Sequence, residues 1–201
     1  MSDGPFDFGW SESAQRFIDL ITGRFVSAEH VREVMTARIN ESFTVLKDFG
    51  EALVSGAADV SEWELAVRVE LKNIHTQMAA LASGGWDNVT PQQWGTVGAR
   101  LKVQYQKLNE LSLALSRGEI SEAEFRRRMD MYARGAWGSY YDAERIMKED
   151  AGYTEEIRNL GGGDNCRTCL GEAGRWAPIG TLRRIGDSEC LSNCNCTFDY
   201  R

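Results

Sequence analysis

The chain has 201 residues, of which 42% are hydrophobic and 26% charged, and its formal net charge is −7. These proportions are typical of a globular protein that is long enough to bury an apolar core. The acidic excess argues against a protein that wraps nucleic acid, because affinity for nucleic acid comes mainly from neutralising phosphates. The first residues carry no basic-then-apolar signal and no apolar run approaches about 18 residues, so we expect neither a signal peptide nor a membrane partner.

The first ten residues, MSDGPFDFGW, mix glycine and proline with Phe6, Phe8 and Trp10 but show no helical period. One interpretation of residues 1–10 is a frayed terminus. The other is an extended arm whose aromatic side chains dock on a partner subunit, since aromatic residues are enriched at the buried centres of interfaces. We therefore take Phe6, Phe8 and Trp10 as candidate partner-binding residues.

Residues 11–160 have the start and stop signals of several helices. Three starts have a serine or threonine followed three residues later by Glu or Gln, the pattern of a capping box: Ser61 with Glu64, Thr90 with Gln93, and Ser121 with Glu124. Pro91 suits the first position of a helix after Thr90. Glycines at residues 84–85, 118 and 152 mark the corresponding ends.

Apolar residues recur at steps of three and four within residues 35–53, 63–81, 94–115 and 125–143. This spacing predicts helices of roughly 30–45 Å that each bury one face. The connections between them are short, which favours antiparallel neighbours. We therefore predict a mainly α fold, an elongated antiparallel helical bundle, followed by a separate Cys-rich module.

That module is expected over residues 161–201, where the helical period ends in the sequence GGGDN. The segment RWAPIGTLRRIG alternates apolar and polar residues between turn signals, which predicts a short hairpin. About forty residues are too few to build a stable apolar core alone, so this segment needs another source of stability.

All the cysteines of the chain lie in this module: Cys166, Cys169, Cys190, Cys194 and Cys196. Two residues separate the first pair and about twenty separate it from the rest, which is close to the spacing of a four-ligand zinc site. A reducing cytoplasm favours metal binding over disulfides. Both histidines, His30 and His75, lie in the helical body, so we predict that four of the five cysteines hold one structural Zn²⁺ through sulfur alone. Disulfides, redox-active thiols and merely buried thiols are the alternatives.

The sequence contains no phosphate-binding loop, dinucleotide fingerprint, nucleophile elbow or HExxH motif, so we do not expect an enzyme. His30 and His75 are expected to be surface or packing residues. In the module, Trp176, Arg183 and Arg184 are candidate partner-binding residues at the rim of the metal site. For Trp176, packing over the zinc loops is an equal alternative.

The segments FRRRMDMYARGAWGSYYDAERI, DNCRTCLGEAGRWAPIG and ECLSNCNCTFDYR resemble the C-terminal half of bacteriophage head-morphogenesis proteins, the minor head proteins similar to the Mu F protein. The usual ending of that family is an acidic residue, C-x-x-C, a glycine-containing stretch and His-Pro-x-Cys-Arg-Cys. Asp164 fits the acidic position, and Cys194 and Cys196 fit the closing cysteines. Cys190 stands near the place of the histidine, and Asn195 replaces the arginine. The resemblance covers about residues 122–201.

The resemblance implies a virion component without catalytic activity that associates with the phage portal or the major capsid protein, and self-association is a further option. It would be located in the phage head or the head–tail connector region, and in the host cytoplasm during assembly. A second hypothesis is a zinc-dependent nucleic-acid-binding or regulatory module in which Arg175, Arg183 and Arg184 face a phosphate backbone. A third is an enzyme that uses a cysteine pair.

Overall fold

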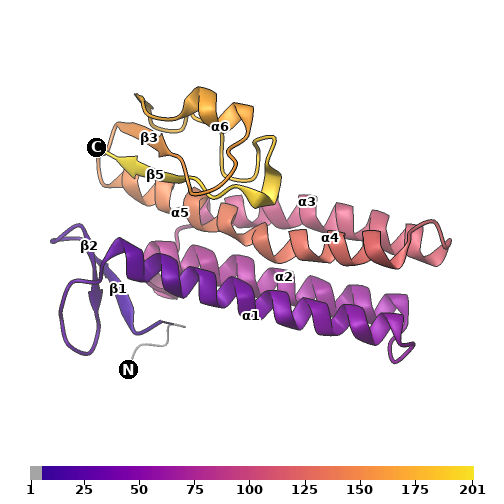
Figure 1. Cartoon of the computed structure of the whole chain (residues 1–201). Coiled ribbons are helices and arrows are strands. Elements are labelled where there is room, and N and C mark those ends of the chain that lie inside the picture. The colour runs from indigo at the N-terminus through magenta and orange to yellow at the C-terminus, as the bar shows by residue number, and fades with distance from the viewer. Residues whose placement is uncertain (1–5) are drawn as a thin grey trace.

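A computed structural model describes residues 6–201, with every side chain except that of residue 130. Five helices between residues 28 and 150 pack side by side into an elongated bundle (Figure 1): α1 (Ala28–Val54), α2 (Val60–Ser83), α3 (Pro91–Ser116), α4 (Glu122–Arg134) and α5 (Ala136–Asp150). The central helix is α2, which contacts α1, α3 and α5. The predicted elongated helical bundle is confirmed. None of the helices in the described part of the chain is long and apolar enough to cross a membrane.

The predicted capping box of Thr90 is confirmed. The Thr90 hydroxyl accepts a hydrogen bond from the backbone N–H of Gln93, and the Gln93 side chain accepts one from the backbone of Thr90 at 2.8 Å. Ser121 caps α4 in the same way, but the carboxylate of Glu124 pairs with two arginines instead of closing the box.

The predicted cap at Ser61 is wrong, because α2 begins two residues earlier. Asp59 is the N-cap, and its carboxylate accepts hydrogen bonds from the backbone N–H groups of Ser61 and Glu62 at 2.8 and 2.9 Å. The Glu62 carboxylate accepts in turn from the backbone N–H of Asp59. The pair of Asp59 and Glu62 has the same spacing as the predicted pair. The negative charge of the Asp59 carboxylate also interacts favourably with the positive end of the helix dipole.

The four apolar stripes form one core in which Trp63 packs against Phe125 with ring centroids 5.4 Å apart. Trp94 is the exception, since it is 37% exposed and stacks on Trp86 at the surface. The last stripe predicts one helix, but the structure divides it at Gly135 into α4 and α5. A Cβ atom at residue 135 would meet the amide end of the Gln104 side chain, which would have to shift to make room for it.

The N-terminal segment differs from the prediction of an extended arm over residues 1–10. Residues 1–5 lie outside the described residues, but β1 (Phe8–Ser11) pairs antiparallel with β2 (Arg16–Asp19). Phe6 and Phe8 are only 6% and 7% exposed, so they pack within this chain and are not free to dock on a partner. Phe17 on β2 meets the Phe8 ring edge-on at 5.7 Å. The sequence analysis missed this hairpin because its second strand lies within residues 11–160, which were assigned to the helical bundle.

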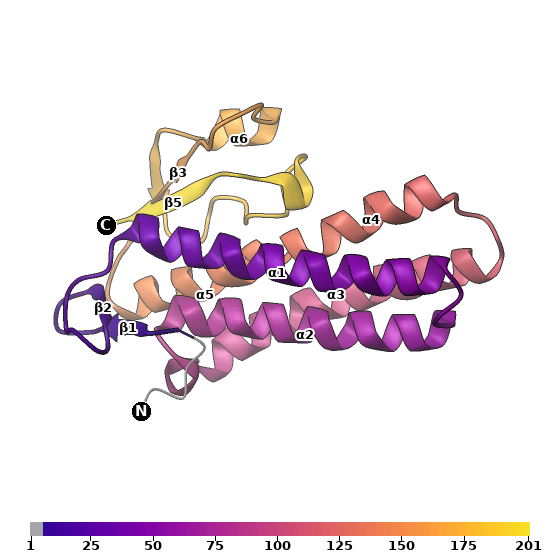
Figure 2. The ribbon, with the colours of Figure 1, turned by 60° about the horizontal axis from the view of Figure 1, so that its bottom comes forward.

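The predicted boundaries at residues 11 and 161 also shift. The first helix begins only at Ala28, where the Ser27 hydroxyl caps it. The C-terminal module begins with β3 (Glu155–Asn159), which is the central strand of an antiparallel sheet between β4 (Trp176–Pro178) and β5 (Thr197–Tyr200). Figure 2 shows this module on one side of the bundle and the β1–β2 hairpin at one end.

Of the hairpin predicted from RWAPIGTLRRIG, the structure contains only the first strand. Residues 176–178 form a strand, but the strand pairs with β3, with Trp176 opposite Ile157. After Pro178 the chain turns away, because the hydroxyl and backbone N–H of Thr181 both donate to the Pro178 carbonyl. The backbone N–H of Leu182 then donates to the buried carboxylate of Glu156 at 2.9 Å. The segment is therefore held by β3 and does not pair with itself.

Candidate metal centre

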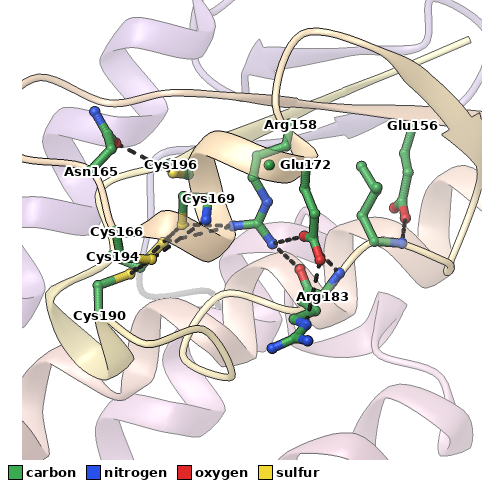
Figure 3. Close-up of polar contacts among 12 residues, drawn as sticks. Glu156, Arg158, Asn165, Cys166, Cys169, Glu172, Arg183, Cys190, Cys194 and Cys196 are labelled. Atoms are coloured by element: carbon green, nitrogen blue, oxygen red, sulfur yellow. Dashed lines mark hydrogen bonds and ion pairs between the residues drawn. The ribbon is translucent and has the colours of Figure 1, made fainter.

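The fold gathers all five cysteines of the chain in the C-terminal module, where the sulfurs form two neighbouring groups of three that share Cys169: Cys166, Cys169 and Cys190, and Cys169, Cys194 and Cys196 (Figure 3). Cys166 is the N-cap of the short helix α6 (Arg167–Glu172), and Cys169 lies in its first turn. The Cys166 sulfur accepts a hydrogen bond from the backbone N–H of Cys169, so the two sulfurs lie on the same side of the turn. Cys190 and Cys194 flank the 3-10 turn η2 (Leu191–Asn193), and Cys196 immediately precedes β5.

Four of the sulfurs form a chain of close contacts. The Sγ atoms of Cys166 and Cys190 are 3.5 Å apart, and the Cys169 Sγ lies 3.7 Å from those of Cys190 and Cys194. A tetrahedral zinc ion with Zn–S bonds of about 2.3 Å separates its sulfur ligands by about 3.8 Å. A disulfide bond is only about 2.05 Å long, and all five cysteines are free thiols. These separations suit a shared metal ion better than a covalent pair.

Cys196 lies beside the same cluster but has a different partner. Its sulfur is within 4.8 Å of those of Cys169 and Cys194, and it also lies 3.9 Å from the side-chain oxygen of Asn165. Cys169, Cys194 and Cys196 are all buried, whereas Cys166 and Cys190 are half-buried at the outer side. The cluster can therefore hold a metal ion that is largely shielded from water.

Arg158 on β3 is the principal charged neighbour of the cluster, and sequence reasoning did not find it. Its side chain is fully buried, and one guanidinium nitrogen donates to the sulfurs of Cys169 and Cys194 at 3.5 and 3.8 Å (Figure 3). The other terminal nitrogen donates to the backbone carbonyl of Arg183 and lies 3.3 Å from the Glu172 carboxylate. A buried cation is costly unless anions surround it, and thiolates would serve as such anions.

No pattern in the sequence TEEIRNL marks Arg158 as buried. Glu156 and Arg158 point inward from β3, while Ile157 on the opposite face of the strand is only half-buried. Alternation of strand side chains normally places the apolar residue inside and the charged ones outside. Here the inward face is charged because Arg158 meets the cysteines and Glu172, and Glu156 meets the backbone of Leu182.

The cysteines have unequal affinity for protons. Burial raises the pKa of Cys169 and takes that of Cys190 to about 12. Burial opposes ionisation of Cys166 as well, but hydrogen bonds from Cys169 and Cys190 lower its pKa to about 7. Of these three, Cys166 is thus the easiest thiolate to form, and a bound cation would be needed to deprotonate Cys169 and Cys190.

The other predicted site residues of the module are engaged by their own chain. Arg183 lies 3.5 Å from the Glu172 carboxylate, and Arg184 lies 3.5 Å from that of Asp142 on α5. Arg175 donates to the carbonyl of Gly171. Trp176 is 36% exposed, and the guanidinium of Arg201 covers its ring at 4.4 Å. A partner-binding role for Trp176, Arg183 and Arg184 remains a prediction.

The two histidines lie in the helical body, away from the cysteines. His30 is exposed at the start of α1, beside Glu33. His75 is fully buried in α2, where its Nδ1 atom lies 2.7 Å from the Ser139 hydroxyl and burial lowers its pKa to about 3. Neither histidine belongs to the candidate metal site among the described residues.

Comparison with models of protein families, with curated proteins and with solved structures yields no match to this chain.

Proposed function

We propose that the cysteine cluster binds one structural zinc ion, and that the protein is a non-catalytic structural component of a bacteriophage head, associated with its portal. The observation that carries the first part is the set of three sulfur–sulfur separations between 3.5 and 3.7 Å. They join Cys166, Cys190, Cys169 and Cys194, which we propose as the four ligands. Cys196, which has Asn165 as its neighbour, is then the cysteine that does not bind the metal.

The chemistry of these ligands favours zinc. Four thiolates in a tetrahedral arrangement are typical of structural zinc sites, in which no position is left for a water or a substrate. Arg158 would support such a site, since its hydrogen bonds to Cys169 and Cys194 would offset part of the two excess negative charges of a zinc ion with four thiolates. Iron is the main competing metal for such a sulfur set.

Metal analysis of single-cysteine variants tests this ligand assignment. Protein purified under reducing conditions should contain about one zinc per chain, as a closed tetrahedral thiolate site requires. Cys196→Ser should keep that zinc, whereas Cys190→Ser should lose it. Cobalt substitution should give the absorption of a tetrahedral thiolate complex. Iron in place of zinc, or equal loss of metal in both variants, would contradict the assignment.

The assignment to a phage head is supported by the resemblance of about residues 122–201 to minor head proteins. The architecture suits an assembly role, since an elongated bundle carries a small module on one side (Figure 1) and the chain has a net charge of −7. An acidic surface inside a head would also repel packaged DNA.

Two observations test this role. The gene should lie beside those of a portal and a terminase, and the tagged protein should co-purify with the portal expressed from the same gene cluster. A gene far from any head gene, together with failure to bind the portal, would overturn the proposal. The competing nucleic-acid hypothesis predicts duplex DNA binding that weakens steeply with salt. We expect little such binding because Arg183 and Arg184 already face carboxylates of their own chain.

A further inference from the structure

A second candidate site lies outside the metal centre, in a groove between the bundle and the C-terminal module. The groove has a volume of about 590 Å³ and is lined by α3, by α4 and the start of α5, and by residues 184–192 of the module. This volume is in the range of natural ligand pockets. Several apolar side chains line it, including Val103, Met131 and Leu191, and Val103 and Leu191 are about half exposed.

The groove is basic although the chain as a whole is acidic. It is lined by six cations but only two carboxylates, Glu110 and Asp187; the cations are Arg100, Lys107, Arg127, Arg128, Arg134 and Arg184. These cations come from three separate segments of the sequence, and only Arg127 and Arg128 belong to a basic run, at residues 126–128. Folding alone brings them together.

Two carboxylates next to the groove are each shared by two arginines. Glu124 accepts from Arg127 and from Arg128, both at 2.8 Å. Asp142 is paired with Arg100 at 2.5 Å and with Arg184 at 3.5 Å. Each arrangement therefore leaves one guanidinium charge without a carboxylate of its own.

The remaining two cations have no carboxylate partner in the part of the chain that the structure describes. Arg134 donates only to the neutral side chain of Asn193 at 3.1 Å, and Lys107 is exposed on α3. Six cations thus meet four carboxylates, which leaves an excess of about two positive charges in the groove.

His75 adds a buried polar atom to the lining of the groove. Its Nδ1 atom lies against the Ser139 hydroxyl, but its Nε2 atom has no hydrogen-bond partner within residues 6–201. Because this atom is fully buried, it lies behind the surface of the groove and offers no direct contact to a molecule that docks there.

We infer that this groove is the docking site for an acidic amphipathic segment of a protein partner. Glutamate or aspartate side chains of the segment would meet the excess arginine and lysine charges, and its apolar side chains would cover Val103, Met131 and Leu191. A phosphodiester backbone would satisfy the charges but would leave these apolar side chains uncovered, so the lining favours a peptide over nucleic acid. The inference does not depend on the phage assignment.

One wall of the groove connects this site to the metal centre. Leu191 and Ser192 line the groove and belong to the turn between Cys190 and Cys194. Metal bound by these two cysteines would hold the turn in place. Occupation of the metal site and binding in the groove should therefore be coupled.

Peptide binding by the full metal-loaded chain tests the inference. The probe is a fluorescein-labelled peptide of glutamate and leucine in helical spacing, followed by fluorescence anisotropy. The double variant Lys107→Glu with Arg134→Glu should weaken binding by about tenfold or more, because it reverses two exposed charges in the groove. Val103→Ser, which changes no charge, should also weaken binding several-fold.

The matched control is Lys72→Glu with Lys102→Glu. These exposed lysines on α2 and α3 do not line the groove, and the change in net charge is the same. The affinity of this control variant for the peptide should stay within about twofold of the wild-type value, since surface changes away from a site have small effects. Equal loss in the control would overturn the inference in favour of general charge attraction. Absence of binding to the wild-type protein would also overturn it, as would tighter binding of a duplex DNA of equal charge or of a polyglutamate without leucine.

Discussion

The helical bundle and the C-terminal module bury different kinds of side chain. The bundle buries large aliphatic and aromatic residues such as Trp63, Leu71 and Leu108, each worth about 1.5–3 kcal/mol when removed from water. The buried side chains of the module include cysteines, Arg158 and Glu156, with Leu182 and Ile185 as its main aliphatic residues. One chain thus combines a region stabilised by apolar packing with a region that buries thiols and charged side chains, for which we propose metal coordination as the main source of stability.

The two regions nevertheless share a continuous boundary. Cys169, Cys194 and Ile185 belong to the same apolar cluster as the bundle core, and Phe198 on β5 meets Tyr141 of α5 edge-on at 6.1 Å. Loss of the module would therefore uncover one face of α5, while α2 would keep its contacts with α1 and α3. The following variants should separate the two sources of stability.

Replacing Cys166 and Cys169 by serine should have the largest effect. A serine hydroxyl cannot replace a thiolate as a metal ligand, and metal coordination contributes about 10–16 kcal/mol to the folding free energy of small zinc domains. The module should unfold, which limited proteolysis within residues 154–201 would detect, while circular dichroism retains most of the helical signal. Loss of the entire helical signal would instead show that module and bundle form a single cooperative unit.

Arg158→Met should lower the free energy of unfolding by about 3–5 kcal/mol, because it removes the buried cation that contacts two sulfurs and the Glu172 carboxylate. Arg183→Met is the matched control, since Arg183 meets the same Glu172 from an exposed position and should cost less than about 1 kcal/mol. A chelator titration of zinc release and a denaturant titration would measure both effects. The prediction fails if the two variants behave alike.

Phe8→Ala should destabilise the bundle end by about 3 kcal/mol, because Phe8 is buried beside Phe17. Phe25→Ala, at a position that is 62% exposed, should cost about 1 kcal/mol at most. Both variants should keep their metal. Equal and negligible costs in a denaturant titration would favour the original interpretation of the N-terminal aromatics as an unpacked arm.

Glu144→Gln should have a smaller, pH-dependent effect. Burial raises the pKa of Glu144 to about 7, against the opposing attraction of Lys148. The folded state therefore keeps a proton between about pH 4.5 and 7 that the unfolded state has lost, so this carboxyl lowers stability as the pH rises through that range. Compared with wild type at the same pH, the glutamine variant should be similar near pH 4.5 and more stable above pH 7. A difference that does not change with pH would contradict this expectation.

Local signals in the sequence predicted much of the fold and the clustering of the cysteines. Thr90 with Gln93 marks a helix start because the cap depends on neighbouring residues, and the cysteine spacing marks a site because each pair lies within one turn. Long-range contacts were missed. Phe17 completes a hairpin, Arg158 is drawn inward by cysteines from other segments, and the basic groove gathers cations from three segments. None of these contacts has a periodic signature.

Hydrogen–deuterium exchange with and without a metal chelator under reducing conditions most directly tests the claim that coordination stabilises the module and apolar packing the bundle. Removal of the metal should abolish protection in β3, α6 and β5, while the backbone amides of α2 stay protected at their original level. Unchanged protection of the module without metal would contradict the account, as would simultaneous loss of protection in α2.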